Sequence, residues 1–127
     1  MRLLFDAHAF LWFVAGDSKL TRTARRAIEQ DQAELYLSAA TVWELAIKAS
    51  LGRLTLPAPT ADYVAEKLRS GVRMLAVDWS HAAAVETLPF HHNDPFDRLL
   101  IAQAKAEGLT IVTGDRIFRR YGTRVIW

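Results

Sequence analysis

Four acidic residues stand at the end of an apolar strand segment or on the apolar stripe of a predicted helix: Asp6, Glu44, Asp97 and Asp115. Burying a lone carboxylate is costly, so four of them in such places call for a shared counter-charge, and a divalent cation supplies one. The chain has no cysteine, which excludes thiolate ligands and disulfides. Carboxylate oxygens favour Mg²⁺ or Mn²⁺ over zinc, so the four acids indicate a site for one of these ions.

Each acid also has a local explanation that involves no ion. Asp6 and Asp115 directly precede predicted helices and are suited to cap them. Glu44 is four residues before Lys48, the spacing of an ion pair on a helix. Asp97 falls in the first turn of a helix, where the helix dipole favours an acid. All four local explanations must hold at once if there is no site, and we therefore favour the shared metal site.

The surroundings of two acids sharpen this interpretation. Asp97 begins the stripe that its helix turns toward the core, at i, i+3, i+4 and i+7. The rest of that stripe is apolar: Leu100, Ile101 and Ala104. Glu44 lies in a helix that is apolar almost all round, which predicts a buried helix. Its apolar residues are Val42, Trp43, Leu45, Ala46, Ile47 and Ala49.

Apolar runs alternate with helical patterns along the whole chain, so we expect a single α/β domain spanning residues 1–127. Strands are predicted at about 2–5, 34–38, 73–77, 109–112 and 124–126. Helices are predicted at about 7–15, 21–31, 39–51, 60–70, 80–88 and 94–107, with a short one from 116, and residues 52–59 are predicted to be irregular. Helices between strands imply right-handed crossovers and a mostly parallel sheet of about five strands. The four acids follow the carboxyl edge of that sheet, where sites in such folds form.

The composition is that of a globular protein of 127 residues, 51% of them hydrophobic. The four acids contribute −4 to a formal net charge of +2, so the remaining residues carry +6. Such a surface attracts polyanions such as nucleic acid, although a basic balance can equally serve solubility. The apolar run from Leu3 to Ala15 resembles a signal peptide but is interrupted by Asp6 and His8. We therefore expect a cytoplasmic protein with no membrane span.

Four segments give the chain a resemblance to a known family: residues 3–12, 38–48, 94–104 and 112–115. Their order and spacing are more specific than any one segment alone. On these segments the chain resembles the PIN-domain proteins, in particular the VapC-like ribonuclease toxins of type II toxin–antitoxin systems. The resemblance implies a three-layer α/β/α PIN-like fold.

The acidic tetrad of that family maps onto the four acids named above, which the resemblance makes the catalytic residues. It also implies dependence on Mg²⁺ or Mn²⁺, endonucleolytic cleavage of RNA, formation of a homodimer and a cognate antitoxin that plugs the site. Within such a site we expect Asp6 and Asp97 to be direct metal ligands. Glu44 and Asp115 are expected to complete the shell directly or through water.

Further residues are candidates for contact with RNA. Thr113 is predicted to hydrogen-bond a ligand or the scissile phosphate, and an ordinary role at a strand end is equally open. A run of arginines after the fourth acid is predicted to meet RNA phosphates, although a solvated helix face explains it almost as well: Arg116, Arg119, Arg120 and Arg124. His91 and His92 are interpreted as ordinary loop residues. Trp12 and Trp43 are interpreted as core residues.

Three other classes share part of this pattern. A PIN-like protein that binds RNA or a partner without cutting it remains the main alternative, but it has no need for four converging acids. A phospho-acceptor receiver domain would have a lysine after a late strand, where this chain has Thr113 to Asp115. A haloacid-dehalogenase-like phosphatase would have a second aspartate two residues after Asp6, where His8 stands.

Overall fold

The sheet at the centre of the molecule contains five parallel strands in the order β3-β2-β1-β4-β5. The computed structural model describes residues 1–127. The strands are β1 (Arg2–Phe5), β2 (Glu34–Ser38), β3 (Arg73–Leu75), β4 (Thr110–Val112) and β5 (Val125–Ile126). All five strands predicted from the sequence are present, which confirms the parallel α/β architecture.

Helices connect and cover the strands. The α-helices are α1 (Ala7–Ala15), α2 (Arg22–Ile28), α3 (Ala39–Ser50), α4 (Thr60–Arg69), α5 (Trp79–Ala84) and α6 (Pro95–Glu107). There are also two short 3₁₀ helices: η1 (Val85–Thr87), between α5 and α6, and η2 (Arg116–Tyr121), between β4 and β5. The helix predicted at about 80–88 is therefore a shorter α-helix continued by a 3₁₀ turn. None of the helices has the length and apolar character needed to cross a membrane.

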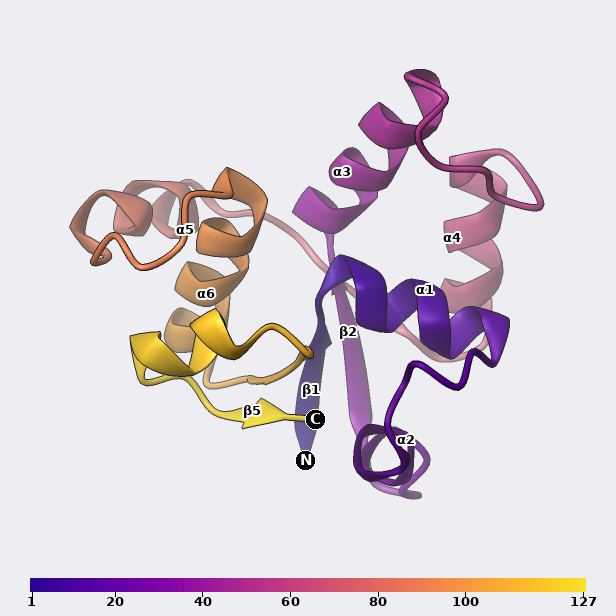
Figure 1. Ribbon diagram of the computed structural model, residues 1–127, viewed down its shortest axis with the longest axis horizontal. Coiled ribbons are helices and arrows are strands. Elements are labelled where there is room, and N and C mark those ends of the chain that lie inside the picture. Colours follow the sequence, from indigo (N-terminus) through magenta and orange to yellow (C-terminus); the bar gives the residue numbers. More distant parts are fainter.

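The two faces of the sheet are buried under different helices. Along β1, Leu3 and Phe5 point into one core with residues of α1 to α4, and Leu4 points into a second core with residues of α6 and η2. This alternation is the two-residue period of a strand buried on both faces. Figure 1 shows the corresponding layers, with α1, α3 and α4 on one side and α5 and α6 on the other. The fold is thus the predicted three-layer α/β/α arrangement.

Helix α3 is not buried all round, which corrects the sequence-based prediction. Leu45 and Glu44 are buried, but Trp43 is 63% exposed and Ala46 is also exposed. Only one face of the helix packs against its neighbours, α1, α4 and α6. The indole of Trp43 instead contacts the ring of Phe96 edge-on at the surface, with 5.3 Å between ring centroids. Trp43 is therefore not a core residue.

A buried polar contact ties the two helices that carry Glu44 and Asp97. The Oγ of Ser38, the N-cap of α3, donates to Oε1 of Gln103 in α6 at 2.6 Å. Nε2 of Gln103 donates to the carbonyl oxygen of Ala76 at 3.2 Å. Gln103 and Ser38 are fully buried, so the bond between them is shielded from water, whereas the bond to Ala76 is part-buried. This side chain therefore fixes the position of α6 relative to the carboxyl ends of β2 and β3.

Replacing Gln103 with leucine should destabilise the protein by about 1–3 kcal/mol, because the buried hydroxyl of Ser38 loses its partner while the volume is nearly kept. Urea unfolding followed by circular dichroism measures this free energy. Gln32→Leu, at an exposed loop position, is the matched control and should change stability by no more than about 0.5 kcal/mol. Equal stability of the two variants would show that Gln103 does not tie the helices.

Candidate acidic active site

Asp6 and Asp115 come together because they follow neighbouring strands. Phe5 of β1 pairs with Val112 of β4, and each aspartate lies just beyond its strand. Thr113 joins them: its Oγ1 donates to Oδ2 of Asp6 at 2.6 Å and accepts from the backbone N–H of Asp115 at 3.0 Å. Thr113 is 1% exposed. Of the two predicted contacts of Thr113, the structure has the hydrogen bond to an expected metal ligand, Asp6, whereas a contact with a phosphate does not fit this buried hydroxyl.

Both aspartates do cap helices, as their local explanation predicts. Oδ1 of Asp6 accepts from Ala9 N at 2.8 Å at the start of α1, and Oδ1 of Asp115 accepts from Ile117 N at 2.9 Å at the start of η2. In each case the cap uses one oxygen, and Oδ2 faces other partners. Capping and a role in a site therefore do not exclude one another. Burial raises the pKa of Asp6 above its ordinary value, against the opposing effect of its bonds to Thr113 and Ala9.

Glu44 is buried on α3 with only part of its bonding capacity used. Its Oε2 pairs with Nζ of Lys48 at 2.7 Å, which confirms the i,i+4 ion pair. Its Oε1 is buried and has no hydrogen-bond partner. An unpartnered buried oxygen of a carboxylate carries a desolvation penalty of about 1–3 kcal/mol or more. A cation at this oxygen would remove that penalty, so the ion pair with Lys48 does not account for the residue.

Asp97 is the acid most affected by its neighbours. Burial raises its pKa to about 7, and the charges of Asp94, Asp6 and Glu44 add to the effect, while His92 opposes it. Asp94 is the N-cap of α6 and Pro95 is its first residue, as predicted. Asp6 and Glu44 are thus near enough for their charges to act on Asp97, and the potential ligand atoms of His92, Asp97 and Asp115 lie within 4.8 Å of one another. Asp115 belongs to the same group because its charge also acts on Asp6.

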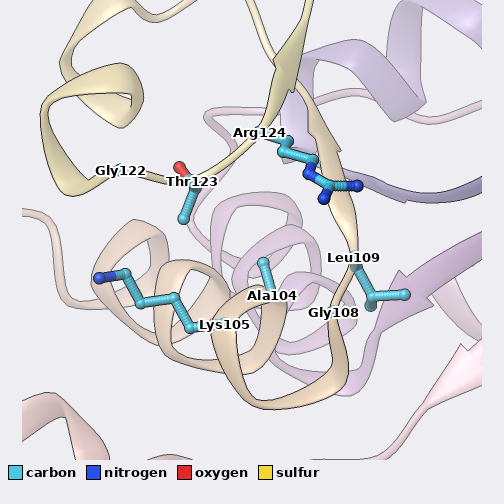
Figure 2. A pocket seen from close by; sticks show the side chains of 7 residues that line it. All are labelled: Ala104, Lys105, Gly108, Leu109, Gly122, Thr123 and Arg124. Atoms are coloured by element: carbon cyan, nitrogen blue, oxygen red, sulfur yellow. The ribbon is translucent and has the colours of Figure 1, made fainter.

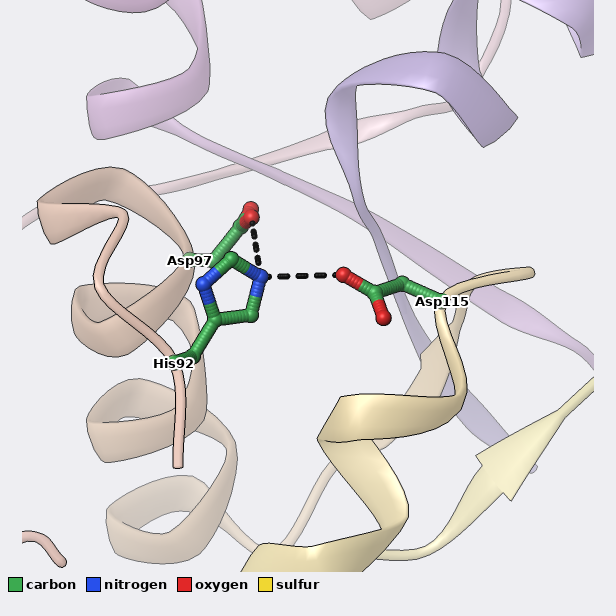
Figure 3. A group of neighbouring side chains, drawn as sticks. All are labelled: His92, Asp97 and Asp115. Atoms are coloured by element: carbon green, nitrogen blue, oxygen red, sulfur yellow. Dashed lines mark hydrogen bonds and ion pairs between the residues drawn. The ribbon is translucent and has the colours of Figure 1, made fainter. Parts of the chain in front are cut away.

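His92 lies between two of the acids (Figure 3). Its Nε2 is 3.0 Å from Oδ2 of Asp97 and 2.9 Å from Oδ2 of Asp115. Its Nδ1 accepts the backbone N–H of Asp94 at 3.1 Å. Because Nδ1 is an acceptor, a neutral ring carries its proton on Nε2 and donates it toward the carboxylates. A metal-ligating histidine normally donates from its other nitrogen, so this arrangement makes His92 a donor to the acids and not a ligand.

The sequence-based interpretation of His92 as an ordinary loop residue was wrong. Tyr121 fixes the backbone of the loop, because its hydroxyl accepts the N–H groups of His91 at 3.0 Å and His92 at 2.7 Å. Arg98 is 5% exposed and donates to that hydroxyl and to carbonyl oxygens of the same loop, including Pro89 at 2.8 Å. The proximity of His92 to the cap residue Asp94 is its only signal in the sequence. His91 instead packs edge-on against the ring of Tyr121.

The predicted arginines are divided between two edges of the sheet. Arg116, Arg119 and Arg120 are exposed on η2. The first two line a hollow of about 220 Å³ together with Asp115. Arg124 lines a different hollow, of about 360 Å³, with Lys105 at the amino ends of β4 and β5 (Figure 2). Arg124 therefore does not belong to the acidic edge, and the hollow beside it contains no acid.

Taken together, the four carboxylates form a donor set that fits a hard divalent cation. The unpartnered oxygen of Glu44 and the all-oxygen chemistry of the acids match the ligands that Mg²⁺ and Mn²⁺ take. The structure brings all four predicted acids to one edge of the sheet, as the sequence predicted. It adds His92 as a fifth residue and removes Arg124.

Comparisons with known proteins agree with this geometry. The sequence model of the PIN domain matches residues 3–123. Ribonuclease VapC22 of Mycobacterium tuberculosis is 34% identical over 120 residues, which is 94% of this chain and 91% of that protein. Ribonuclease VapC16 of the same organism is 47% identical over 60 residues, 46% of this chain and 43% of that protein.

Solved structures share the fold. VapBC2 from Rickettsia felis, bound to a DNA fragment from its promoter, has a TM-score of 0.73 at 14% identity and covers 98% of this chain and 97% of its own. DNA-bound VapBC from Salmonella typhimurium has a TM-score of 0.69 at 21% identity and covers 98% of this chain and 96% of its own. With the sequence model matched over nearly the whole length and a full-length VapC relative, the chain belongs to the PIN-domain family as a VapC-like member.

Proposed function

We propose that this chain is a metal-dependent endoribonuclease and the toxin component of a toxin–antitoxin pair. The observation that carries the proposal is the convergence of four carboxylates, one of which keeps a buried oxygen without a partner. A module that only binds RNA or a partner gains nothing from this costly arrangement. The names of the relatives, which are ribonucleases, support the same conclusion.

The acids would hold Mg²⁺ or Mn²⁺, with Asp6 and Asp97 as direct ligands and Glu44 and Asp115 completing the shell. The bound ion supplies Lewis-acid activation of a water and charge neutralisation at a phosphate. Thr113 and His92 keep the carboxylates in place by donating to them. Nothing in the donor set requires a second ion.

The surface around the acids would bind RNA. Arg116, Arg119 and Arg120 are exposed on η2, which begins directly after Asp115. Guanidinium groups on this helix are suited to bind the phosphates that flank the phosphate being cut. They also offset the negative charge that four carboxylates present to an approaching polyanion.

The protein partners would be a cognate antitoxin and a second copy of the chain. The solved structures that share the fold are toxin–antitoxin complexes. Large apolar side chains are exposed on this chain, among them Trp43 at 63%, Trp79 at 80% and Phe90 at 83%. Exposed aromatic residues of this size are typical of interfaces.

Purified protein should cut single-stranded regions of total cellular RNA in Mg²⁺ or Mn²⁺, and EDTA should abolish cleavage. Asp6→Asn and Asp97→Asn should each lower the rate about 100-fold or more, the size expected for loss of a group that acts in the reaction. Asp62→Asn, at an exposed position of α4, is the matched control and should cut normally. RNA binding without cleavage by wild type would favour the binding-only alternative.

Affinity for Mn²⁺ should rise about tenfold between pH 6 and pH 8, because Asp97 has a pKa of about 7 and must lose its proton to bind an ion. The stability of the metal-free protein should instead decrease as the pH rises. The raised pKa favours folding below the ordinary value of 3.8, and this contribution is lost as the pH rises through about 7. Isothermal titration calorimetry measures the affinity, and an affinity that is flat over this range would contradict the prediction.

His92→Ala should lower the stability of the metal-free protein by about 1.5–3 kcal/mol, the range for a hydrogen bond to a charged group. A cation would replace the lost donor, so saturating Mn²⁺ should stabilise this variant more than wild type. His92→Gln, whose amide nitrogen reaches the position of Nε2, should restore part of the loss, whereas His91→Ala serves as the control. Thermal unfolding with and without Mn²⁺ provides the readout. A smaller metal response in His92→Ala would mean that His92 is itself a ligand.

A further inference from the structure

Another hollow, with a volume of about 460 Å³, adjoins the acidic site. Asp6 and Asp115 belong to the acidic site and also line this hollow. The remainder is lined by His8, Trp12, Lys19, Gly114 and Trp127. We call this the aromatic hollow. None of these five residues has a side-chain hydrogen bond to Asp6 or Asp115, whose partners are Ala9, Thr113, Ile117 and His92, so the hollow calls for an explanation of its own.

Three rings line the aromatic hollow. His8 stacks on Trp12, one helical turn away on α1, with 5.5 Å between ring centroids and 28° between planes. The rings of Trp12 and Trp127 are 5.8 Å apart but tilted by 48°, so they do not stack face to face. Both indoles are only half-buried. Half-buried indoles that line a hollow keep part of their ring surface accessible to another planar group.

Gly114 is required by this arrangement. A Cβ atom at this position would lie 2.8 Å from Cε2 and 3.0 Å from Cζ2 of Trp127. The indole therefore rests directly on the backbone between Thr113 and Asp115. Trp127 also lines the smaller hollow that contains Arg116 and Arg119. The indole thus separates a ring-lined hollow from one lined by cations, and both adjoin Asp115.

Positive charge accompanies the rings. Lys19 is exposed, and its Nζ lies 5.9 Å from the centre of the Trp12 ring. A cation, planar aromatic faces and a metal-binding carboxylate cluster match the parts of a nucleotide: a base, a neighbouring phosphate and the phosphate to be cut. An apolar side chain alone would leave the cation and the two acids of this wall without partners.

We propose that the aromatic hollow binds one nucleotide of a single-stranded RNA next to the scissile phosphate, with its base against Trp12 and Trp127 and its outer phosphate near Lys19. The proposal rests on the ribonuclease function proposed above. It assigns residues outside the acidic cluster to substrate binding, and a base inside a duplex, stacked on its neighbours, cannot enter such a hollow. It also explains the glycine of the Thr113 to Asp115 segment.

Binding of a fluorescein-labelled single-stranded RNA oligonucleotide, measured by anisotropy in EDTA so that no cleavage occurs, tests the proposal. Trp12→Leu should weaken binding about tenfold, the effect of losing one base–aromatic stack. Trp12→Phe should recover most of it. Lys19→Ala should weaken binding less and should reduce the slope of log Kd against log salt by about 0.7, the value for one phosphate on a single strand. A duplex of the same sequence should bind equally to wild type and Trp12→Leu.

Controls separate this proposal from the one on which it rests. Trp79→Ala removes an exposed indole that lines neither hollow, and Lys105→Ala removes a cation at the opposite edge. His8→Ala and Lys19→Ala change exposed positions, so they remain informative if Trp12→Leu fails to fold. If wild type binds and cuts RNA but these variants behave like the controls, the aromatic hollow is not a nucleotide site while the nuclease assignment stands. If wild type neither binds nor cuts single-stranded RNA, both proposals fall.

Discussion

Repulsion among carboxylates is the constraint on which the rest of this structure depends. Four acids meet at the carboxyl edge of the sheet, three of them buried or nearly so, and the effect of their convergence is seen in the raised pKa of Asp97. Like charges in a poorly solvated place cannot all remain ionised without counter-charge. The protein supplies donors instead: backbone N–H groups, the hydroxyl of Thr113, the ammonium of Lys48 and the imidazole of His92. These donors reduce the repulsion but do not pair every carboxylate oxygen, because Oε1 of Glu44 has no hydrogen-bond partner.

Hydrogen bonds of buried side chains hold the scaffold around the acids in place against this repulsion. Gln103 ties α6 to the ends of β2 and β3, and Arg98 with Tyr121 fixes the loop that presents His92. Both Gln103 and Arg98 are buried polar residues with several bonds, and each sits in the helix that carries Asp97. Flexible supports would allow the carboxylates to move apart and relieve their repulsion. The buried hydrogen bonds of α6 prevent this movement, because breaking them leaves unpaired polar groups in the core.

Local patterns predicted most of this architecture, and the exceptions have a common cause. The strands, the helix caps and the four acids depend on spacing along the chain, which the sequence displays directly. The exposure of Trp43 was not predictable, because α3 has apolar residues all round and only the packing of its neighbours decides which face is covered. His92 was wrongly taken for an ordinary loop residue, and Arg124 was wrongly grouped with the site, for a similar reason. Their positions depend on how a loop and a short edge strand are held by distant residues, not on any period of their own.

For each acid the sequence allows a structural explanation and a functional one. At this site the two explanations are compatible. A carboxylate has two oxygens, and in Asp6 and Asp115 one caps a helix while the other faces the site. The cap fixes the side-chain orientation, and with it the place where the second oxygen points. A helix that begins directly after a parallel strand therefore aims its capping acid at the carboxyl edge of the sheet. Ordinary capping is thus the means by which a short α/β chain brings acids from distant segments to one cation.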